Sequence, residues 1–298
     1  MIVSSLYSDA MTGPMSGQTV LVTGATSGLG LEASVKLAGM GAEVVLVARD
    51  RARGEAAVAD VQSRSGSRTV SVMYCDFASL TQIRALAIEV SAKHSTLRVL
   101  VNNAGSVSAK RMLTEEGLER TFAVNHLGVF LLTNLLLDVL ARSAPARVVT
   151  VASAAHRQGT LPFDDLQFEH GGYSTNRAYA RSKLANVLFT TELARRLAGT
   201  GVTANCLHPG VVATNIWSHA PWFTQPLIAV GKLFMASAEQ GAETIVYLAA
   251  SPEVQGLTGG YYERNRIVVP SRLGQDEAIA RRLWERSAAL VGLPTSLS

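Results

Sequence analysis

Cysteine, charged residues and aromatic residues are all scarce in this chain of 298 residues. Its two cysteines, Cys75 and Cys206, cannot form the set of bridges that holds small secreted domains together. Both lie in apolar, strand-like runs, so we expect buried free thiols and a cytoplasmic protein. Charged residues make up 17% of the chain and hydrophobic residues 48%, a composition that excludes intrinsic disorder.

Long hydrophobic runs and blocks of one charge are also missing. The longest apolar stretch, Val129–Leu140, is interrupted by Thr133, Asn134 and Asp138, so no segment of roughly 18 apolar residues is available to span a bilayer. The net charge is only +4 and the arginines are scattered, which argues against nucleic-acid binding. Residues 1–16 lack the pattern of a signal peptide, and we expect a loosely ordered leader there.

Apolar runs of strand length alternate with longer segments of helical pattern. The strand-like runs are Thr19–Thr23, Glu43–Ala48, Thr69–Cys75, Leu97–Val101, Ala146–Ala152 and Val202–Leu207. The segments with apolar repeats at three and four residues are Leu29–Gly39, Arg51–Arg64, Ser79–Lys93, Thr114–Arg142 and Tyr173–Leu197. This alternation predicts one doubly wound α/β domain over residues 17–298, with a parallel sheet covered on both faces.

The first predicted strand runs into a glycine-rich turn, TGATSGLG at residues 23–30, and a helical pattern follows. Glycines allow a tight turn and a close approach of the backbone to a phosphate, and a helix N-terminus offers free N–H groups to it. The spacing differs from the commoner G-x-G-x-x-G, and a glycine triplet can also form a plain turn. The strand–turn–helix context favours a dinucleotide site.

The end of the second predicted strand, Ala48-Arg49-Asp50, bears on the choice of cofactor. A guanidinium at this position favours the 2′-phosphate of NADP, because it can form charge-assisted bidentate hydrogen bonds. An acid here accepts the ribose 2′-hydroxyl of NAD, so Asp50 would favour NAD if it pointed at the ribose. We predict NADP, with NAD as the alternative.

Tyr179 and Lys183 lie four residues apart, on one face of the predicted helix Tyr173–Leu197. A phenol with a pKa near 10 is a poor acid–base group at neutral pH, and a neighbouring ammonium is expected to lower that pKa. Ser153 ends the fifth predicted strand, at the sheet edge where ligands of such folds bind. A lone Tyr-x-x-x-Lys is usually an ordinary helix face, but its combination with Ser153 and the glycine turn predicts a catalytic site.

The segment from His208 to Ser237 is the least regular part of the chain and is rich in proline and aromatic residues. We expect residues 211–236 to form a substrate loop that covers an apolar ligand. A plain packed excursion is the second interpretation. The third is a surface that docks on a partner or on lipid, although membrane contact is not predicted.

Several motifs in order resemble the short-chain dehydrogenase/reductase family over about residues 17–262. They are the TGATSGLG turn, Asp76, Asn102-Asn103-Ala104-Gly105, Asn125, Ser153, Tyr179-x-x-x-Lys183 and Pro209-Gly210. The resemblance implies a Rossmann fold with a central seven-stranded, mostly parallel sheet.

The resemblance also implies a role for each candidate catalytic residue. Tyr179 would be the acid–base and Ser153 the hydroxyl that orients the substrate. Lys183 would contact the nicotinamide ribose and lower the tyrosine pKa, and Asn125 would hold a water for proton relay.

Cofactor contacts follow from the glycine turn, Arg49 and the resemblance together. Asp76 and Phe77 would meet the adenine, and residues 102–105 would pack beneath the cofactor. The expected cofactor-binding set is Gly24, Thr26, Ser27, Gly28, Leu29, Gly30, Arg49, Asp76, Phe77, Asn102, Ala104, Gly105, Tyr179, Lys183, Pro209, Gly210, Val212 and Thr214.

Three stretches, residues 125–128, 179–186 and 207–212, are similar to the branch that contains retinol dehydrogenases and their bacterial relatives. That branch implies NADP, a bulky apolar carbonyl or alcohol as substrate, and a homodimer or homotetramer paired through the two longest helices. Light-dependent protochlorophyllide reductase is also similar, but no cysteine lies near the tyrosine helix. A non-catalytic NADP-binding sensor is the rival hypothesis, and it is disfavoured because Tyr179 and Lys183 are both present.

The remaining histidines are given ordinary interpretations. His126 and His208 lack the clustered spacing of metal ligands, so we predict no metal site. His156 is close enough to Ser153 to touch a substrate, but loop histidines are mostly solvated.

Overall fold

The computed structural model describes residues 13–210 and 237–295. Its centre is one sheet of eight strands in the order β3-β2-β1-β4-β5-β6-β7-β8. The strands are β1 (Thr19–Thr23), β2 (Glu43–Ala48), β3 (Val70–Tyr74), β4 (Val99–Asn102), β5 (Ala146–Val151), β6 (Val202–His208), β7 (Tyr261–Glu263) and β8 (Arg266–Ile267). All pair in parallel except β8, which is antiparallel to β7 and extends the seven expected strands by one.

The strand order places the chain's switch point between β1 and β4. From β1 the chain moves outward to β2 and β3, then returns to β4 on the other side and moves outward again. In such sheets the loops at the carboxyl ends of the two central strands diverge and leave a crevice for a ligand. The glycine turn follows β1 and residues 103–106 follow β4, so both border this crevice.

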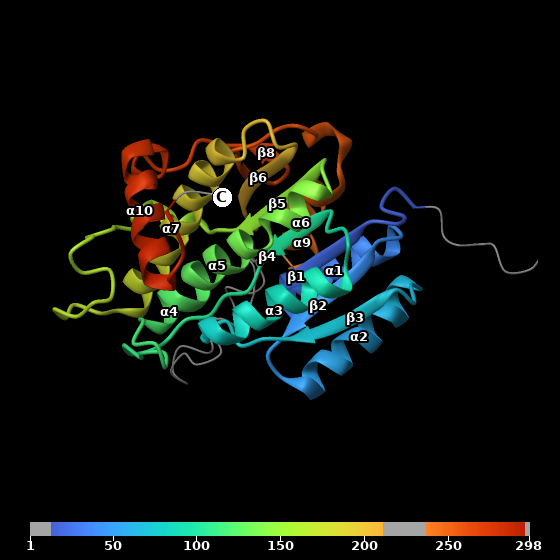
Figure 1. The fold of residues 1–298 in the computed structure, drawn as a ribbon, viewed down its shortest axis with the longest axis horizontal. Helices are drawn as coiled ribbons and strands as arrows, with labels where there is room; N and C mark the ends of the chain where they lie inside the picture. Colours follow the sequence, from blue (N-terminus) through green and yellow to red (C-terminus); the bar gives the residue numbers. More distant parts are fainter. Residues whose placement is uncertain (1–12, 211–236, 296–298) are drawn as a thin grey trace, which may run out of the picture.

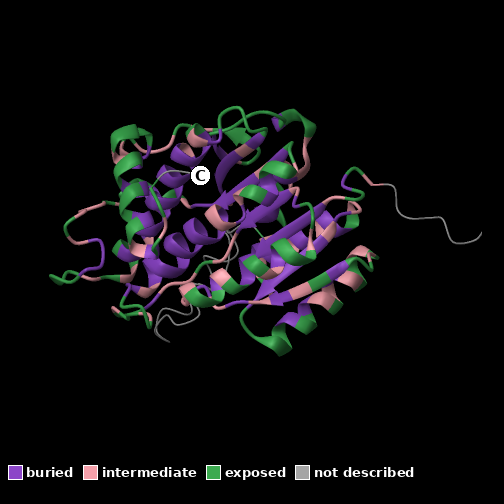
Figure 2. Cartoon of the chain, viewed as in Figure 1, coloured by how far each residue is buried: buried purple, intermediate pink, exposed green. Residues whose placement is uncertain are grey.

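Helices cover both faces of the sheet (Figure 1). One face packs against α1 (Gly28–Gly39), α2 (Arg51–Ser65) and α9 (Ala238–Ala250). The other packs against α3 (Leu80–Lys93), α5 (Gly128–Leu135), α6 (Leu137–Arg142) and α7 (Thr175–Arg196), and α10 (Glu277–Val291) lies outside α7 and α5. The central strands are buried, and exposure concentrates on the outer sides of helices and in loops (Figure 2). This confirms the doubly wound α/β fold.

The predicted helix Thr114–Arg142 is broken in the structure. Residues 114–118 form a turn closed by a bridge between Leu113 and Glu119. After it come α4 (Arg120–Phe122), a π-helical turn η1 (Ala123–Leu127), α5 and α6. The buried Glu119 carboxylate begins α4, because it accepts the N–H groups of Thr121 (2.9 Å) and Phe122 (2.8 Å). The π-turn contains Asn125, a predicted catalytic residue, and π-turns frequently occur at functional sites.

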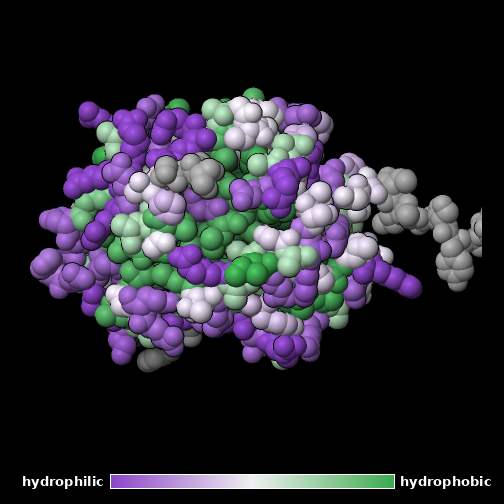
Figure 3. Space-filling view, viewed as in Figure 1, coloured by the Kyte–Doolittle hydropathy of each residue, from purple (hydrophilic) through white to green (hydrophobic). Residues whose placement is uncertain are grey.

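The C-terminal helix α10 lies on α7 and α5. Trp284 is buried between them, stacked on Phe189 (ring centroids 5.9 Å apart) and edge-on to Phe130 (4.8 Å). Ser287 Oγ is 2.8 Å from His126 Nε2 in η1. The outer side of α10 is exposed and charged at positions 281, 282, 285 and 286, and the upper left of Figure 3, over part of α10, is hydrophilic.

Two predicted segments fall largely outside the described residues. Most of the predicted leader is among them, but residues 13–16 form a turn in which Met15 is buried and its N–H donates to Met40 O at 3.0 Å. The predicted substrate loop, residues 211–236, lies wholly outside. Among the described residues, no helix is long and apolar enough to cross a membrane.

Candidate active site

The glycine turn after β1 is tied to the end of β4. Gly24 has a φ of +64°, which favours glycine, and a Cβ on Gly30 would lie 2.6 Å from Gly24 O and 2.5 Å from Asn103 Nδ2. Asn103 Nδ2 donates to Thr23 O (2.9 Å) and Gly24 O (3.0 Å). Thr23 Oγ1 in turn accepts the N–H groups of Asn103 and Ala104. These bonds tie the two loops at the switch point together, and Asn103 belongs to the stretch of residues 102–105 that is expected to pack beneath the cofactor.

The N-terminus of α1 opens at this turn. Its N-cap residue is Ser27, whose side chain makes no capping hydrogen bond, whereas α2, α3, α7, α9 and α10 each have a side-chain cap. First-turn N–H groups of a helix need an acceptor, and an anionic ligand can supply it. Gly28 has a φ of +58°, and the place where its Cβ would lie is open space. The turn at residues 24–30 thus fits a dinucleotide phosphate.

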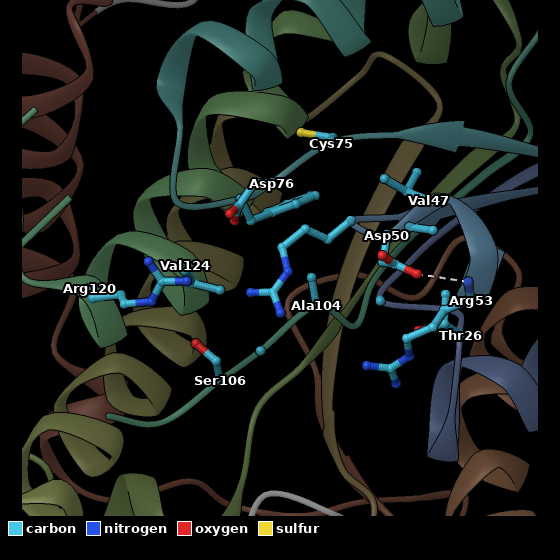
Figure 4. Close-up of a pocket in the computed structure, with 15 residues that line it drawn as sticks. Thr26, Val47, Asp50, Arg53, Cys75, Asp76, Ala104, Ser106, Arg120 and Val124 are labelled. Carbon is cyan, nitrogen blue, oxygen red and sulfur yellow. Dashed lines mark hydrogen bonds between the residues drawn. The ribbon is translucent and has the colours of Figure 1, made fainter. Parts of the chain in front are cut away.

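An open pocket of about 220 Å³ lies at the carboxyl ends of β1, β2, β3 and β4 (Figure 4). Seven of the predicted cofactor residues line it: Gly24, Thr26, Arg49, Asp76, Phe77, Ala104 and Gly105. Asn102 does not reach it. The Asn102 side chain is buried and donates to Thr133 Oγ1 (2.9 Å), so it holds β4 against α5 from beneath the pocket.

Three arginines line this pocket: Arg49, Arg53 and Arg120. Figure 4 shows Arg120 on one side of the pocket and Arg53 with Asp50 on the other. Asp50 is the N-cap of α2, and its Oδ1 accepts the N–H of Arg53 at 2.9 Å. Arg53 and Arg120 were not predicted from the sequence. The position of Arg53 in the first turn of α2 could have indicated it, because helical side chains tilt toward the helix N-terminus, which here lies at the end of β2.

Ser153, Tyr179 and Lys183 meet where β5 ends against α7. Ser153 Oγ accepts the N–H of Ala155 (3.2 Å) and lies close enough to the hydroxyl of the half-buried Tyr179 to influence its pKa. Lys183 Nζ lies 5.7 Å from the centroid of the Tyr179 ring and donates to Val151 O at 2.8 Å. The spacing in the sequence therefore does bring the three predicted groups together.

Burial controls the protonation of these groups. It raises the pKa of Tyr179, and only the hydrogen bond from Ser153 opposes that rise. The expected lowering of this pKa by Lys183 is not found, so the phenol is protonated at neutral pH. Burial also lowers the pKa of Lys183 to about 8, because removal from water disfavours the charged ammonium.

Asn125 ties the loop after β4 to the catalytic helix. Its side chain is fully buried: Oδ1 accepts the N–H of Ser106 (2.7 Å) and Nδ2 donates to Ser182 Oγ (3.0 Å). Ser182 Oγ donates to Tyr179 O at 2.8 Å. A Cβ on Gly105 would lie 3.5 Å from Asn125 Oδ1, so Gly105 packs directly beside this amide. These bonds use one donor and one acceptor of the Asn125 amide, and the water for proton relay stays a prediction.

The last predicted cofactor residues follow β6. Pro209 and Gly210 lie at its carboxyl end, and Gly210 has a φ of +85°. Val212 and Thr214 lie outside the described residues. Within the described part of the chain, no cluster of three histidine, cysteine or acidic side chains is arranged to hold a metal ion.

Fold and site together define an α/β enzyme that binds a dinucleotide beside a serine, a tyrosine and a lysine. The family model for short chain dehydrogenases matches residues 18–221, and the chain belongs to this family. It is an NAD(P)-dependent dehydrogenase/reductase, which transfers a hydride between the nicotinamide and a carbonyl or alcohol carbon.

Individual relatives place the chain in the retinol dehydrogenase-like branch. Retinol dehydrogenase 14 of Homo sapiens is 44% identical over 299 residues, which cover 94% of this chain and 88% of that protein. Retinol dehydrogenase 13 of Homo sapiens is 42% identical, with coverage of 93% and 85%.

Solved structures agree on the fold. A crystal structure of an uncharacterized protein from Mycobacterium paratuberculosis has a TM-score of 0.77 and 34% identity, with coverage of 97% and 98%. A short chain dehydrogenase from Shigella flexneri complexed with NADP has a TM-score of 0.69 and 21% identity, with coverage of 86% and 100%.

Proposed function

We propose that this protein uses NADP to interconvert an apolar carbonyl compound and its alcohol. The observation that carries the choice of cofactor is the pocket at the end of β2, where Arg49 and Arg53 both line the pocket and the acid between them in sequence, Asp50, caps α2. A 2′-phosphate adds two negative charges that guanidinium groups hold by bidentate hydrogen bonds. The two arginines at the end of β2 therefore favour NADP over NAD.

Bound NADP would supply or accept the hydride at nicotinamide C4. In reduction the substrate carbon gains the hydride, its C=O electron pair moves to oxygen, and the Tyr179 hydroxyl gives that oxygen its proton. Ser153 Oγ lies beside the Tyr179 hydroxyl and orients the same substrate oxygen. Because burial keeps the phenol protonated at neutral pH, Tyr179 is in the form that donates. In oxidation the proton returns to Tyr179.

The apolar substrate class rests on the relatives rather than on a described pocket. The curated proteins most similar to this chain include several named retinol dehydrogenases, and retinol is a terpenoid alcohol. The predicted substrate loop, residues 211–236, lies outside the described residues. No observation favours the non-catalytic sensor.

Assembly and location are separate proposals. A homo-oligomer paired through α5 and α7 would need their outer faces free, but α10 covers both helices in the described structure. We therefore place any self-association on another surface. Light scattering on the purified protein gives the subunit number. A cytoplasmic location is supported by the two buried free cysteines, and cell fractionation tests it.

The proposed function is tested by measuring oxidation of NADPH and of NADH with aromatic, terpenoid and steroid-like aldehydes and ketones. We expect turnover of apolar carbonyls with NADPH, and Tyr179→Phe should abolish it while NADPH still binds. Tyr247→Phe, on α9 at the other face of the sheet, is the matched control and should keep full activity. Tight NADPH binding without turnover on any compound would favour the sensor, and an active Tyr179→Phe variant would refute the assigned acid.

A further inference from the structure

His156 is fully buried three residues after Ser153, in the short turn η2 (Ala154–Gln158). The sequence analysis takes it for a solvated loop histidine, and the structure shows that this is wrong. Its ring Nδ1 lies 2.7 Å from Ser153 O, and its ring Nε2 lies 3.0 Å from the backbone nitrogen of Ser271. Both ring nitrogens are thus bonded to backbone groups of two separate segments.

The partners determine which nitrogen carries the proton. A backbone N–H can only donate, so Nε2 accepts from Ser271 and carries no hydrogen. In the neutral ring the proton is then on Nδ1, where it donates to Ser153 O. Burial lowers the pKa of His156, which keeps the ring neutral. The charged or titratable groups that face it are Arg157, His208 and the ring of Tyr261, whose centroid is 4.9 Å away.

The ring fixes the backbone that aims the Ser153 hydroxyl. Ser153 O accepts both the Nδ1–H and the backbone N–H of His156 (3.1 Å), while Ser153 Oγ accepts from Ala155 and contacts Tyr179. On its other side the ring accepts the N–H of Ser271, and the neighbouring Arg157 Nη2 donates to Val269 O at 2.8 Å. Together these bonds anchor η2 to residues 269–271. The segment after β8 therefore holds η2 in place, and η2 holds Ser153.

We propose that His156 is a positioning residue: its Nδ1–H bond to Ser153 O sets the Ser153 hydroxyl beside Tyr179 for the substrate oxygen. The inference rests on the proposed function for its kinetic readout, because it assigns a role that acts only through Ser153.

Two isosteres separate the two bonds of the ring. In His156→Asn the side-chain amide takes the place of Nδ1 and can still donate to Ser153 O. In His156→Gln the amide takes the place of Nε2, so it can meet the Ser271 N–H but not Ser153. We expect kcat of His156→Gln to fall by about tenfold to a hundredfold, and that of His156→Asn to stay within about threefold, because small misplacements of an orienting group are costly. If His156 had only a structural role, the loss of kcat in each variant would instead follow the fall in its thermal unfolding midpoint.

A double-mutant cycle tests whether the effect passes through Ser153. Adding His156→Gln to Ser153→Ala should lower kcat no further, and NADPH affinity should stay unchanged in all four proteins. Equal losses of kcat in both backgrounds, or a loss in His156→Asn as large as in His156→Gln, would overturn the proposal.

The ring itself gives a readout that needs no activity. Among the six histidines of the chain, the ¹⁵N signals of His156 are those missing from the His156→Gln spectrum. They should show a neutral ring protonated on Nδ1 between pH 6 and 8. A ring protonated on Nε2, or charged at pH 6, would refute the inference. A protein with the expected ring and no turnover would refute the proposed function alone.

Discussion

Replacing Arg49 by alanine should weaken NADPH binding selectively. Arg49 follows β2 directly and is exposed in the pocket that Arg53 and Arg120 also line. Only the 2′-phosphate distinguishes NADPH from NADH, so the loss should appear in the first cofactor and not in the second. The backbone at residues 48–50 should be unaffected, because Asp50 still caps α2.

The size of the effect follows from the exposure of Arg49. A hydrogen bond to a charged group contributes about 1.5–3 kcal/mol, and solvent screening at an exposed site brings this toward the lower end. A loss of about 1.4 kcal/mol corresponds to a tenfold rise in Kd for NADPH. Kd for NADH should change by less than about twofold, because NADH has no 2′-phosphate for Arg49 to bind. The double variant Arg49→Ala/Arg53→Ala should lose less NADPH binding free energy than the two single variants summed, because both guanidinium groups bind the same phosphate.

Cofactor fluorescence titrations at two salt concentrations measure these constants. Arg51→Ala is the matched control: it removes the same charge two residues further along the chain, at the start of α2, but Arg51 pairs with Glu55 (3.7 Å) and lies over the Tyr74 ring, outside the pocket lining. The assignment of the phosphate site fails if Arg49→Ala weakens NADH as much as NADPH, or if Arg51→Ala reproduces its effect.

Three further predictions test the turn, the lysine and the last helix. Gly30→Ala should abolish cofactor binding and destabilise the fold by about 1–3 kcal/mol in urea titrations, because its Cβ would overlap Gly24 O. Gly39→Ala at the end of α1, where a Cβ would have no atom nearer than 4.0 Å, should change neither cofactor binding nor stability. Lys183→Met should be inactive yet no less stable at pH 7. In the wild type the pKa of this lysine is lowered from 10.5 to about 8, so between these pH values the unfolded chain binds one more proton than the folded protein. The wild type should therefore gain stability as the pH rises from 8 to 10.5, and the variant should lack that gain. Trp284→Ala should lower the free energy of unfolding by about 3–5 kcal/mol and promote self-association, because it loosens α10 from α5 and α7. The exposed Glu285→Ala should leave both the unfolding midpoint and the gel-filtration profile unchanged.

The strands β1 to β6 could be predicted to within two residues at each end because they are continuous apolar runs. β1 and β2 have the predicted bounds, since each apolar run is bordered by polar residues or a turn. β7 and β8 could not be predicted. They have three and two residues, too few for any periodicity, and they form only because β6 offers its edge to Tyr261–Glu263.

The break in the predicted helix Thr114–Arg142 has a tertiary cause. The apolar spacing continues through the segment, but buried groups elsewhere set its geometry: Glu119 N donates to Gln167 Oε1 (2.6 Å), and Asn125 is bonded to Ser106 and Ser182. None of these partners is near in sequence. A π-turn that depends on them leaves no local signal.

The candidate site divides in the same way. Ser153, Tyr179 and Lys183 were found because helical spacing and strand ends place them without knowledge of the loops. Arg53, Arg120 and His156 were missed because their roles depend on loops that only the fold brings together. His156 shows this most clearly, since its second partner, Ser271, is 115 residues away.

The end of β5 joins stability to catalysis. Two carbonyls there are held by side chains that the chemistry also depends on: Val151 O by Lys183, and Ser153 O by His156. Burying an ammonium without an anion destabilises the fold, as the lowered pKa of Lys183 records. The bond to Val151 O offsets part of that cost. An apolar side chain at position 183 would avoid the cost altogether, so the buried lysine fits a role in the chemistry rather than in stability.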